Sequence, residues 1–177
     1  MSKIFIQDNF FEEDIFKKIK LEIPTVEFTP PPKKIRDKQS TYWFEHKLPM
    51  LCEVQKLIYK NIELYFNKKV DINLITDTSC IYTMSNAKDH PRPHRDSFVT
   101  HQCLIYIKGD PHLANGTGFY TPDTKNDLKF YLNLNVGFKE NRAIFFSSDN
   151  WHSSMQWSGE SSWRYSIANF MTMKGEK

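Results

Sequence analysis

The chain has 177 residues, of which 40% are hydrophobic, and a formal net charge of +3. This length is enough for one domain with a substantial core, and so small a charge argues against a nucleic-acid binder, which gathers Lys and Arg on one face. Three cysteines (Cys52, Cys80 and Cys103) lack CxxC spacing, which favours free thiols in a reducing compartment. Without a signal-like N-terminus or a run of about 18 apolar residues, a soluble cytoplasmic protein is expected.

The first 71 residues are predicted to be mainly helical. Residues 3–10 indicate a short strand and turn, and residues 10–23 a helix with Phe11, Ile15 and Ile19 on one face. Residues 29–40 are expected to form a polar, proline-led loop, either a lid or a surface connection. Residues 49–67 give the clearest helix, opened by Pro49, with an apolar stripe that consists of Leu51, Val54, Ile58, Ile62 and Tyr65.

From residue 72 onward the pattern changes to short aromatic or β-branched segments separated by turn residues. The predicted strands are 79–84, 102–107, 118–121, 128–137, 143–147, 154–158 and 164–171. The fourth of them shows period two, with one face made of Leu128, Phe130, Leu132, Leu134 and Val136. Strands at this spacing are typical of sandwiches and barrels. We therefore expect a single domain over 1–177, with a helical buttress (1–71) before an all-β body (72–177).

A candidate metal site begins at His94 and Asp96. Pro91 and Pro93 oppose a helix, so His90 is expected to lie in a loop and not to share a helical face with His94. In an extended strand, His94 and Asp96 point to one side, with the intervening arginine opposite. His152 follows Asp96 with 55 residues between them. Two imidazoles and one carboxylate on one face are the ligand set of the non-haem Fe(II) oxygenases, which need the remaining metal positions open.

A candidate anion site lies twelve residues further on. In a strand, Arg164 and Ser166 face the same way, and an inward arginine needs an anionic partner. A guanidinium fork beside a hydroxyl suits a small carboxylate, although a protein acid such as Glu160 is the alternative partner. Asp149 could orient His152 from behind the site, or serve simply as a turn residue. His101 could line a substrate entrance or be an ordinary hydrogen-bonded histidine.

The order and spacing of His94-x-Asp96, His152 and Arg164-x-Ser166 resemble the signature of the 2-oxoglutarate- and Fe(II)-dependent dioxygenases. Residues 4–19 and the glycine-rich segment 116–122 are similar to the prolyl-4-hydroxylase-like branch of that superfamily. The resemblance implies a mainly β fold with N-terminal helices, the double-stranded β-helix or jelly roll. It covers essentially the whole chain.

The resemblance also implies roles for individual residues. His94, Asp96 and His152 would be the catalytic Fe(II) ligands, and Arg164 and Ser166 would bind the distal carboxylate of 2-oxoglutarate. Tyr82 is similar in position to a tyrosine that contacts this co-substrate, and the alternative interpretation of Tyr82 is a half-buried strand aromatic.

The reaction implied is hydroxylation of a C–H bond in a protein side chain or amino acid, with O2 consumed and succinate and CO2 released. The partners would be 2-oxoglutarate, O2 and a peptide or small-molecule substrate. There are two alternatives: a non-catalytic jelly-roll module that binds a metal or a small acid as a sensor, and a zinc hydrolase or isomerase that uses the same three ligands. The hydrolase would need a general base, and no glutamate lies near these residues in the sequence.

Overall fold

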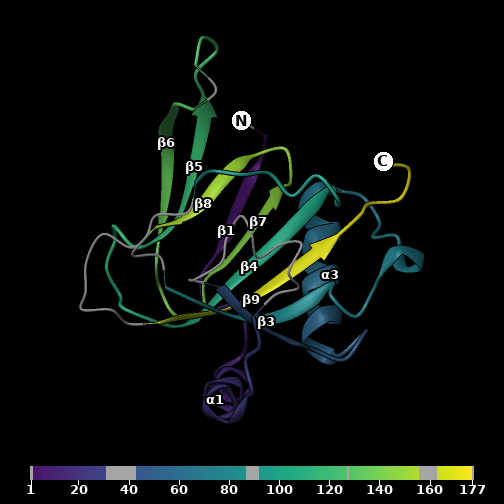
Figure 1. Cartoon of the computed structure of the whole chain (residues 1–177). Helices are drawn as coiled ribbons and strands as arrows, with labels where there is room; N and C mark the ends of the chain where they lie inside the picture. The colour runs from purple at the N-terminus through teal and green to yellow at the C-terminus, as the bar shows by residue number, and fades with distance from the viewer. Residues whose placement is uncertain (1, 31–42, 87–91, 127, 156–162, 177) are drawn as a thin grey trace.

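The structure, a computed structural model, describes residues 2–30, 43–86, 92–126, 128–155 and 163–176. Within these residues, two antiparallel β-sheets face each other, with helices on the far side of the larger sheet (Figure 1). This is the expected jelly roll with N-terminal helices. No helix in the described ranges is long and apolar enough to cross a membrane. The expected loop at 29–40, from residue 31 onward, lies outside the described residues, as does His90.

The larger sheet has the strand order β1-β7-β4-β9-β3-β2. Its strands are β1 (Ile4–Gln7), β7 (Ala143–Ser147), β4 (His101–Lys108), β9 (Arg164–Met171), β3 (Cys80–Ser85) and β2 (Trp43–Lys47). The smaller sheet has the order β6-β5-β8, with β6 (Phe130–Gly137), β5 (Gly116–Pro122) and β8 (Trp151–Met155). The helices are α1 (Glu13–Glu22) and α3 (Glu53–Phe66), with 3-10 turns at Ile23–Thr25 and Ile72–Leu74.

Side-chain alternation divides the larger sheet into a helix face and an inner face. On β4, Cys103, Ile105 and Ile107 belong to the core under the helices, together with residues such as Ile58 of α3. Tyr106 of the same strand belongs to a second core between the two sheets. A strand residue of the larger sheet therefore packs either under the helices or between the two sheets, according to the face on which it lies.

The helices form where the sequence predicts, but their packing faces differ in detail. Ile15 was expected on the packing face but is 43% exposed. Helix α1 packs instead through Phe16, Ile19 and Ile23, so Phe16 takes the place expected for Ile15. Pro49 does not open α3, which begins at Glu53 after a turn. In that turn Leu51 has a positive φ of 55° and is exposed, so it is not part of the stripe.

Most strands of the β body also lie where the sequence predicts, with three differences. Strand β2 was not expected, since it is an edge strand recognisable only by its pairing with β3. Strand β8 begins at Trp151 and not at residue 154, and residues 156–158 lie outside the described ranges. Leu128 and Leu132 are exposed, because Leu128 precedes β6 and a register shift opposite Phe119 and Tyr120 interrupts the alternation.

Candidate metal centre

His94, Asp96 and His152 come together at the edge of the smaller sheet. One ligand atom from each residue lies within 4.8 Å of the other two. His152 Nε2 is 3.4 Å from Asp96 Oδ2, and His94 Nε2 is 4.0 Å from Asp96 Oδ1. Nitrogen and oxygen ligands about 2.1 Å from one metal ion stand about 3 Å apart, so small side-chain movements would close the three atoms around an ion.

The backbone holds the two histidines directly opposite each other. His94 N–H donates to the carbonyl of His152 and His152 N–H to the carbonyl of His94, both at 2.9 Å. The strand expected at 94–96 is reduced to this isolated antiparallel bridge. It extends no further because Pro93 has no N–H to donate and a turn starts at Asp96. The expected sidedness still holds: Arg95 points away from Asp96 and lies 4.8 Å from the centre of the Trp151 ring.

The second nitrogen of each imidazole faces a backbone carbonyl. His152 Nδ1 lies 3.0 Å from the carbonyl of Asn150, and His94 Nδ1 lies 3.4 Å from that of Arg92. Both carbonyls can accept a hydrogen from Nδ1, and the Nε2 atoms on the side of Asp96 are then the ones that would bind a metal ion. Asp149 is exposed and does not orient His152, so that alternative is wrong and the turn interpretation stands.

The charge states also suit a metal ion. Burial, followed by the nearby His152, lowers the pKa of His94, which favours its neutral form. Burial alone would raise the pKa of Asp96, but the hydrogen bond and charge of His152 outweigh it and the pKa falls below its ordinary value. At neutral pH the cluster therefore combines a neutral imidazole at His94 with an ionised carboxylate, as ligation demands.

Arg164 reaches across the space between the sheets. It is 8% exposed, with Nη1 donating to the Gly116 carbonyl and Nη2 donating to Ser154 Oγ at 2.8 Å. Its guanidinium carbon lies 5.6 Å from the centre of the Tyr106 ring. The described residues thus offer it a carbonyl, a hydroxyl and a ring, and burial lowers its pKa. Glu160, the alternative acidic partner, lies outside the described residues.

Two buried polar atoms near this arginine have no hydrogen-bond partner among the described residues: Arg164 Nε and Ser166 Oγ. Unpaired buried polar atoms are rare in proteins and indicate a missing partner. Ser154, which binds the guanidinium, follows His152 by two residues and shares its face of β8, a separation of about 7 Å. A five-carbon dicarboxylate can span that distance.

Comparison by sequence and by structure gives different results. The sequence matches no protein-family model and none of the curated proteins. A prolyl-4-hydroxylase of Pseudomonas putida is similar in structure, with a TM-score of 0.57, 12% identity, and coverage of 97% of this chain and 94% of that one. A prolyl hydroxylase of Trichoplax adhaerens, solved with a peptide fragment of the hypoxia inducible factor oxygen degradation domain, has a TM-score of 0.61, 14% identity and coverage of 97% and 84%.

A third similar structure is the epimerase SnoN in complex with Fe3+, alpha ketoglutarate and nogalamycin RO. Its TM-score is 0.58 at 10% identity, with coverage of 97% of this chain and 79% of that one. The chain has the fold of the 2-oxoglutarate- and Fe(II)-dependent oxygenases. At such low identity the likeness shows the fold alone.

In this oxygenase fold Tyr82 lies on the wrong face of the sheet for its expected role. It belongs to the core under the helices, and its hydroxyl donates to Glu22 Oε2 at 3.1 Å. Its partner across β9 is Ile167, whereas Ser166 pairs with Thr83 on the inner face. Since alternate residues of a strand face opposite ways, Tyr82 cannot contact a molecule held by Arg164, and the strand-aromatic interpretation fits.

The sequence did not single out other residues on the inner face of the oxygenase fold. The buried Tyr106 lies beside Arg164, and its hydroxyl donates to Thr117 Oγ1 at 2.7 Å. Gln102 lies close enough to Asp96 to help lower the pKa of that carboxyl, although within the described part of the chain Gln102 Nε2 completes no well-formed hydrogen bond. Strand alternation would have placed both on one face of β4, but only the sheet pairing shows which face carries the site.

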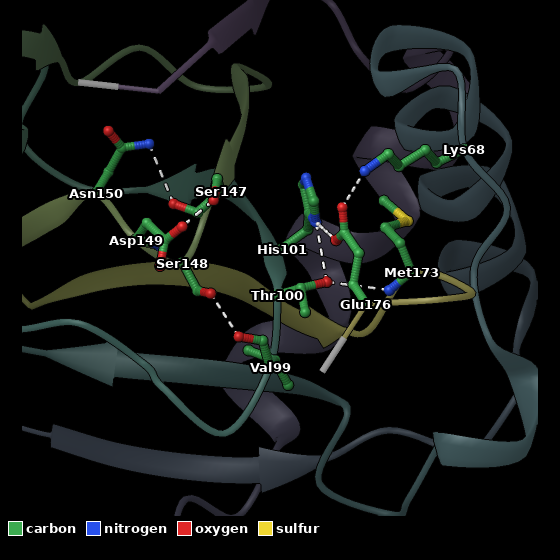
Figure 2. A network of polar contacts seen from close by, with 10 residues as sticks. All are labelled: Lys68, Val99, Thr100, His101, Ser147, Ser148, Asp149, Asn150, Met173 and Glu176. Carbon is green, nitrogen blue, oxygen red and sulfur yellow. Dashed lines mark hydrogen bonds and ion pairs between the residues drawn. The ribbon is translucent and has the colours of Figure 1, made fainter.

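A cavity of about 740 Å³ lies behind the segment that carries Asp96. Arg95, Ser97, His101 and Glu176 are among its lining residues, but the three ligand side chains are not. Figure 2 shows the polar network there: His101 Nδ1 lies 3.0 Å from Thr100 Oγ1 and 3.4 Å from Glu176 Oε2. His101 is therefore a hydrogen-bonded histidine on the helix face of the oxygenase fold, not a residue of the metal cluster.

Proposed function

We propose that the chain is an Fe(II)- and 2-oxoglutarate-dependent oxygenase that hydroxylates a C–H bond of a protein side chain or amino acid. Succinate and CO2 would be released. One observation carries the proposal. Buried Arg164, whose Nε has no partner among the described residues, bonds to Ser154, and Ser154 lies two residues after His152 of the cluster of two histidines and an aspartate. The fold supports it, because structures of similar architecture include an enzyme named as alpha ketoglutarate dependent.

The donor set fits Fe(II). His94, Asp96 and His152 would hold the ion from one side, with both Nε2 atoms directed toward the carboxylate. When bound, Fe(II) with 2-oxoglutarate and O2 supplies the oxidising power for hydroxylation. The chain itself fixes the ligands: the Asn150 carbonyl sets the tautomer of His152, and the Phe146 ring packs at 4.9 Å against that imidazole and excludes water from one side.

Arg164 and Ser166 would bind the distal carboxylate of the co-substrate. The free Nε and the hydroxyl provide two donors on the inner face, and the hydrogen bonds to Gly116 and Ser154 hold the guanidinium in place. The carboxylate would neutralise a charge that is otherwise buried without an acid among the described residues. The substrate class rests on fold-level analogy with the prolyl hydroxylases, one of which was solved with a peptide.

A co-substrate turnover assay tests the proposal. Purified protein is given Fe(II) and 2-oxoglutarate without oxygen, oxygen is then admitted, and succinate is measured. His94→Ala should abolish metal retention, whereas Arg164→Ala should mainly weaken co-substrate affinity. Tyr82→Phe, on the opposite face of the sheet, is the matched control and should turn over normally. Metal binding without succinate would favour the sensing module, and unchanged turnover in His94→Ala and Arg164→Ala would remove the oxygenase.

A further inference from the structure

The three cysteines of the chain gather under α3, on the helix face of the larger sheet. Cys80 of β3 and Cys103 of β4 both pair with Asn169 of β9, so these three residues form a row across neighbouring strands. Cys52 is the N-cap residue of α3. The chain reaches it by a short turn from Leu48, whose N–H donates to the Cys80 carbonyl at 3.0 Å. Residues far apart in the sequence thus form one thiol cluster.

Within this cluster, Cys52 and Cys80 are neighbours, because Cys52 follows by four residues the Leu48 amide that is bonded to Cys80, and each thiol shifts the pKa of the other. The two differ in accessibility: Cys52 is partly exposed, whereas Cys80 is 2% exposed. Cys103 is also buried, two strands away from Cys80. An accessible thiol beside a buried one is the arrangement in which a first oxidation at the surface can be resolved by the neighbour.

The chemistry of the two thiols differs in the same sense. The hydrogen bond from Cys80 and the N–H groups that begin α3 lower the pKa of Cys52 to about 6, against the effect of burial. The hydrogen bond with Cys52, followed by burial, raises the pKa of Cys80. The lowered pKa increases the thiolate fraction of Cys52 relative to that of Cys80, and the thiolate is the nucleophilic form.

Polar groups around the pair strengthen the case. Gln55, Tyr59 and Asn169 are buried, and Gln55 Nε2, Tyr59 Oη and Asn169 Nδ2 complete no well-formed hydrogen bond with the described residues. Each of these atoms can donate a hydrogen. Unpaired donors in an otherwise apolar core are costly, and an oxygen added to a cysteine sulfur would give them an acceptor.

We propose that Cys52 and Cys80 are an oxidation site that forms a reversible disulfide with a hydroperoxide. The Cys52 thiolate attacks the peroxide, the O–O bond breaks, and Cys52 becomes a sulfenic acid while the released oxyanion takes up a proton. The Cys80 sulfur then attacks the Cys52 sulfur, and the S–O bond breaks. The hydroxide leaves with the Cys80 proton as water. Two thiols and one hydroperoxide thus give one disulfide, one alcohol or water molecule, and water.

Peptide mapping of the oxidised full-length protein tests this. Cleavage after Lys and Arg places the three cysteines in separate peptides, 48–56, 70–88 and 96–108. After hydrogen peroxide treatment and alkylation under denaturing conditions, we expect a 48–56 to 70–88 disulfide that dithiothreitol reverses. Cys103 should remain alkylated. A cross-link through 96–108, or irreversible oxidation of Cys52 without a disulfide, would overturn the proposal.

Matched serine variants separate the two steps. Cys103→Ser should form the disulfide as the wild type does. Cys80→Ser should accumulate a Cys52 sulfenic acid that dimedone traps, because the resolving sulfur is absent. Cys52→Ser should react at least tenfold more slowly with peroxide, and an equal rate in that variant would refute Cys52 as the nucleophile. The wild-type map needs no substitution, so the proposal stays testable if a variant fails to fold.

Discussion

Replacing Arg164 by methionine separates a co-substrate arginine from a structural one. The substitution removes the hydrogen bonds to Gly116 and Ser154, each contributing about 1.5–3 kcal/mol because the donor is charged. It also removes a guanidinium whose burial without a carboxylate costs several kcal/mol. These effects oppose each other. We therefore expect the unfolding free energy of the ligand-free protein to change by less than about 2 kcal/mol, in either direction.

Urea unfolding of ligand-free wild type and Arg164→Met measures this difference. The paired experiment is thermal unfolding with a divalent metal ion and 2-oxoglutarate, without oxygen. At a concentration of 100 Kd the co-substrate stabilises the wild type by about 2.7 kcal/mol, or roughly 5–10 °C for a chain of this size. Arg164→Met should lose that shift and keep the one caused by metal alone.

The opposite pattern would refute the reasoning. If a protein carboxylate such as Glu160 holds Arg164, the substitution leaves that acid unpaired and costs about 3–5 kcal/mol. A loss of that size, with the shift caused by 2-oxoglutarate preserved, would make Arg164 a structural residue.

Three further predictions follow from the contacts described. His152→Ala should release metal on dialysis, whereas Asp149→Ala, whose side chain does not orient His152, should retain it; equal retention in both would contradict the ligand set. Tyr82→Phe should lower stability by about 1 kcal/mol through the lost bond to Glu22 and leave 2-oxoglutarate affinity unchanged, and a weakened affinity would restore its expected role. The Arg142 hydrogen bond, with help from Lys139, lowers the pKa of Asp8 from 3.8 to about 2. The ionised Asp8 therefore stabilises the folded state fully above pH 3.8, and this stabilisation is lost as the pH falls through 2. Asp8→Asn should therefore lower the free energy of unfolding, measured with denaturant, by about 1 kcal/mol at pH 7 and by almost nothing below pH 2. An equal loss at both pH values would show that the stabilisation does not come from the ionised carboxylate.

Local patterns predicted those features that depend on local geometry. Strand β9 begins and ends where expected, and Arg164 and Ser166 share a face because alternate residues of a strand point to the same side. The bridge at His94 keeps Asp96 on the same side for the same reason, even though no full strand forms. That the three ligand residues lie together is now observed, while their binding of a metal stays a prediction.

The errors concern information that the local sequence does not contain. The position of Tyr82 in a strand was predicted correctly, but its face depends on pairing with Ile167 of β9, more than eighty residues away. The orientation of His152 depends on the carbonyl of Asn150, and a carbonyl is present at every residue, so no side chain marks it. Strand β2 exists through its hydrogen bonds to β3 and has no strong pattern of its own.

The reciprocal bonding of His94 and His152 provides a way to observe the site before any metal is added. Because each backbone amide is secured by the other residue's carbonyl, both amide protons should resist exchange with solvent deuterium, and they should lose that protection in the same opening event. Two resonances would then record whether the imidazoles are in position, in any variant and without knowledge of the substrate.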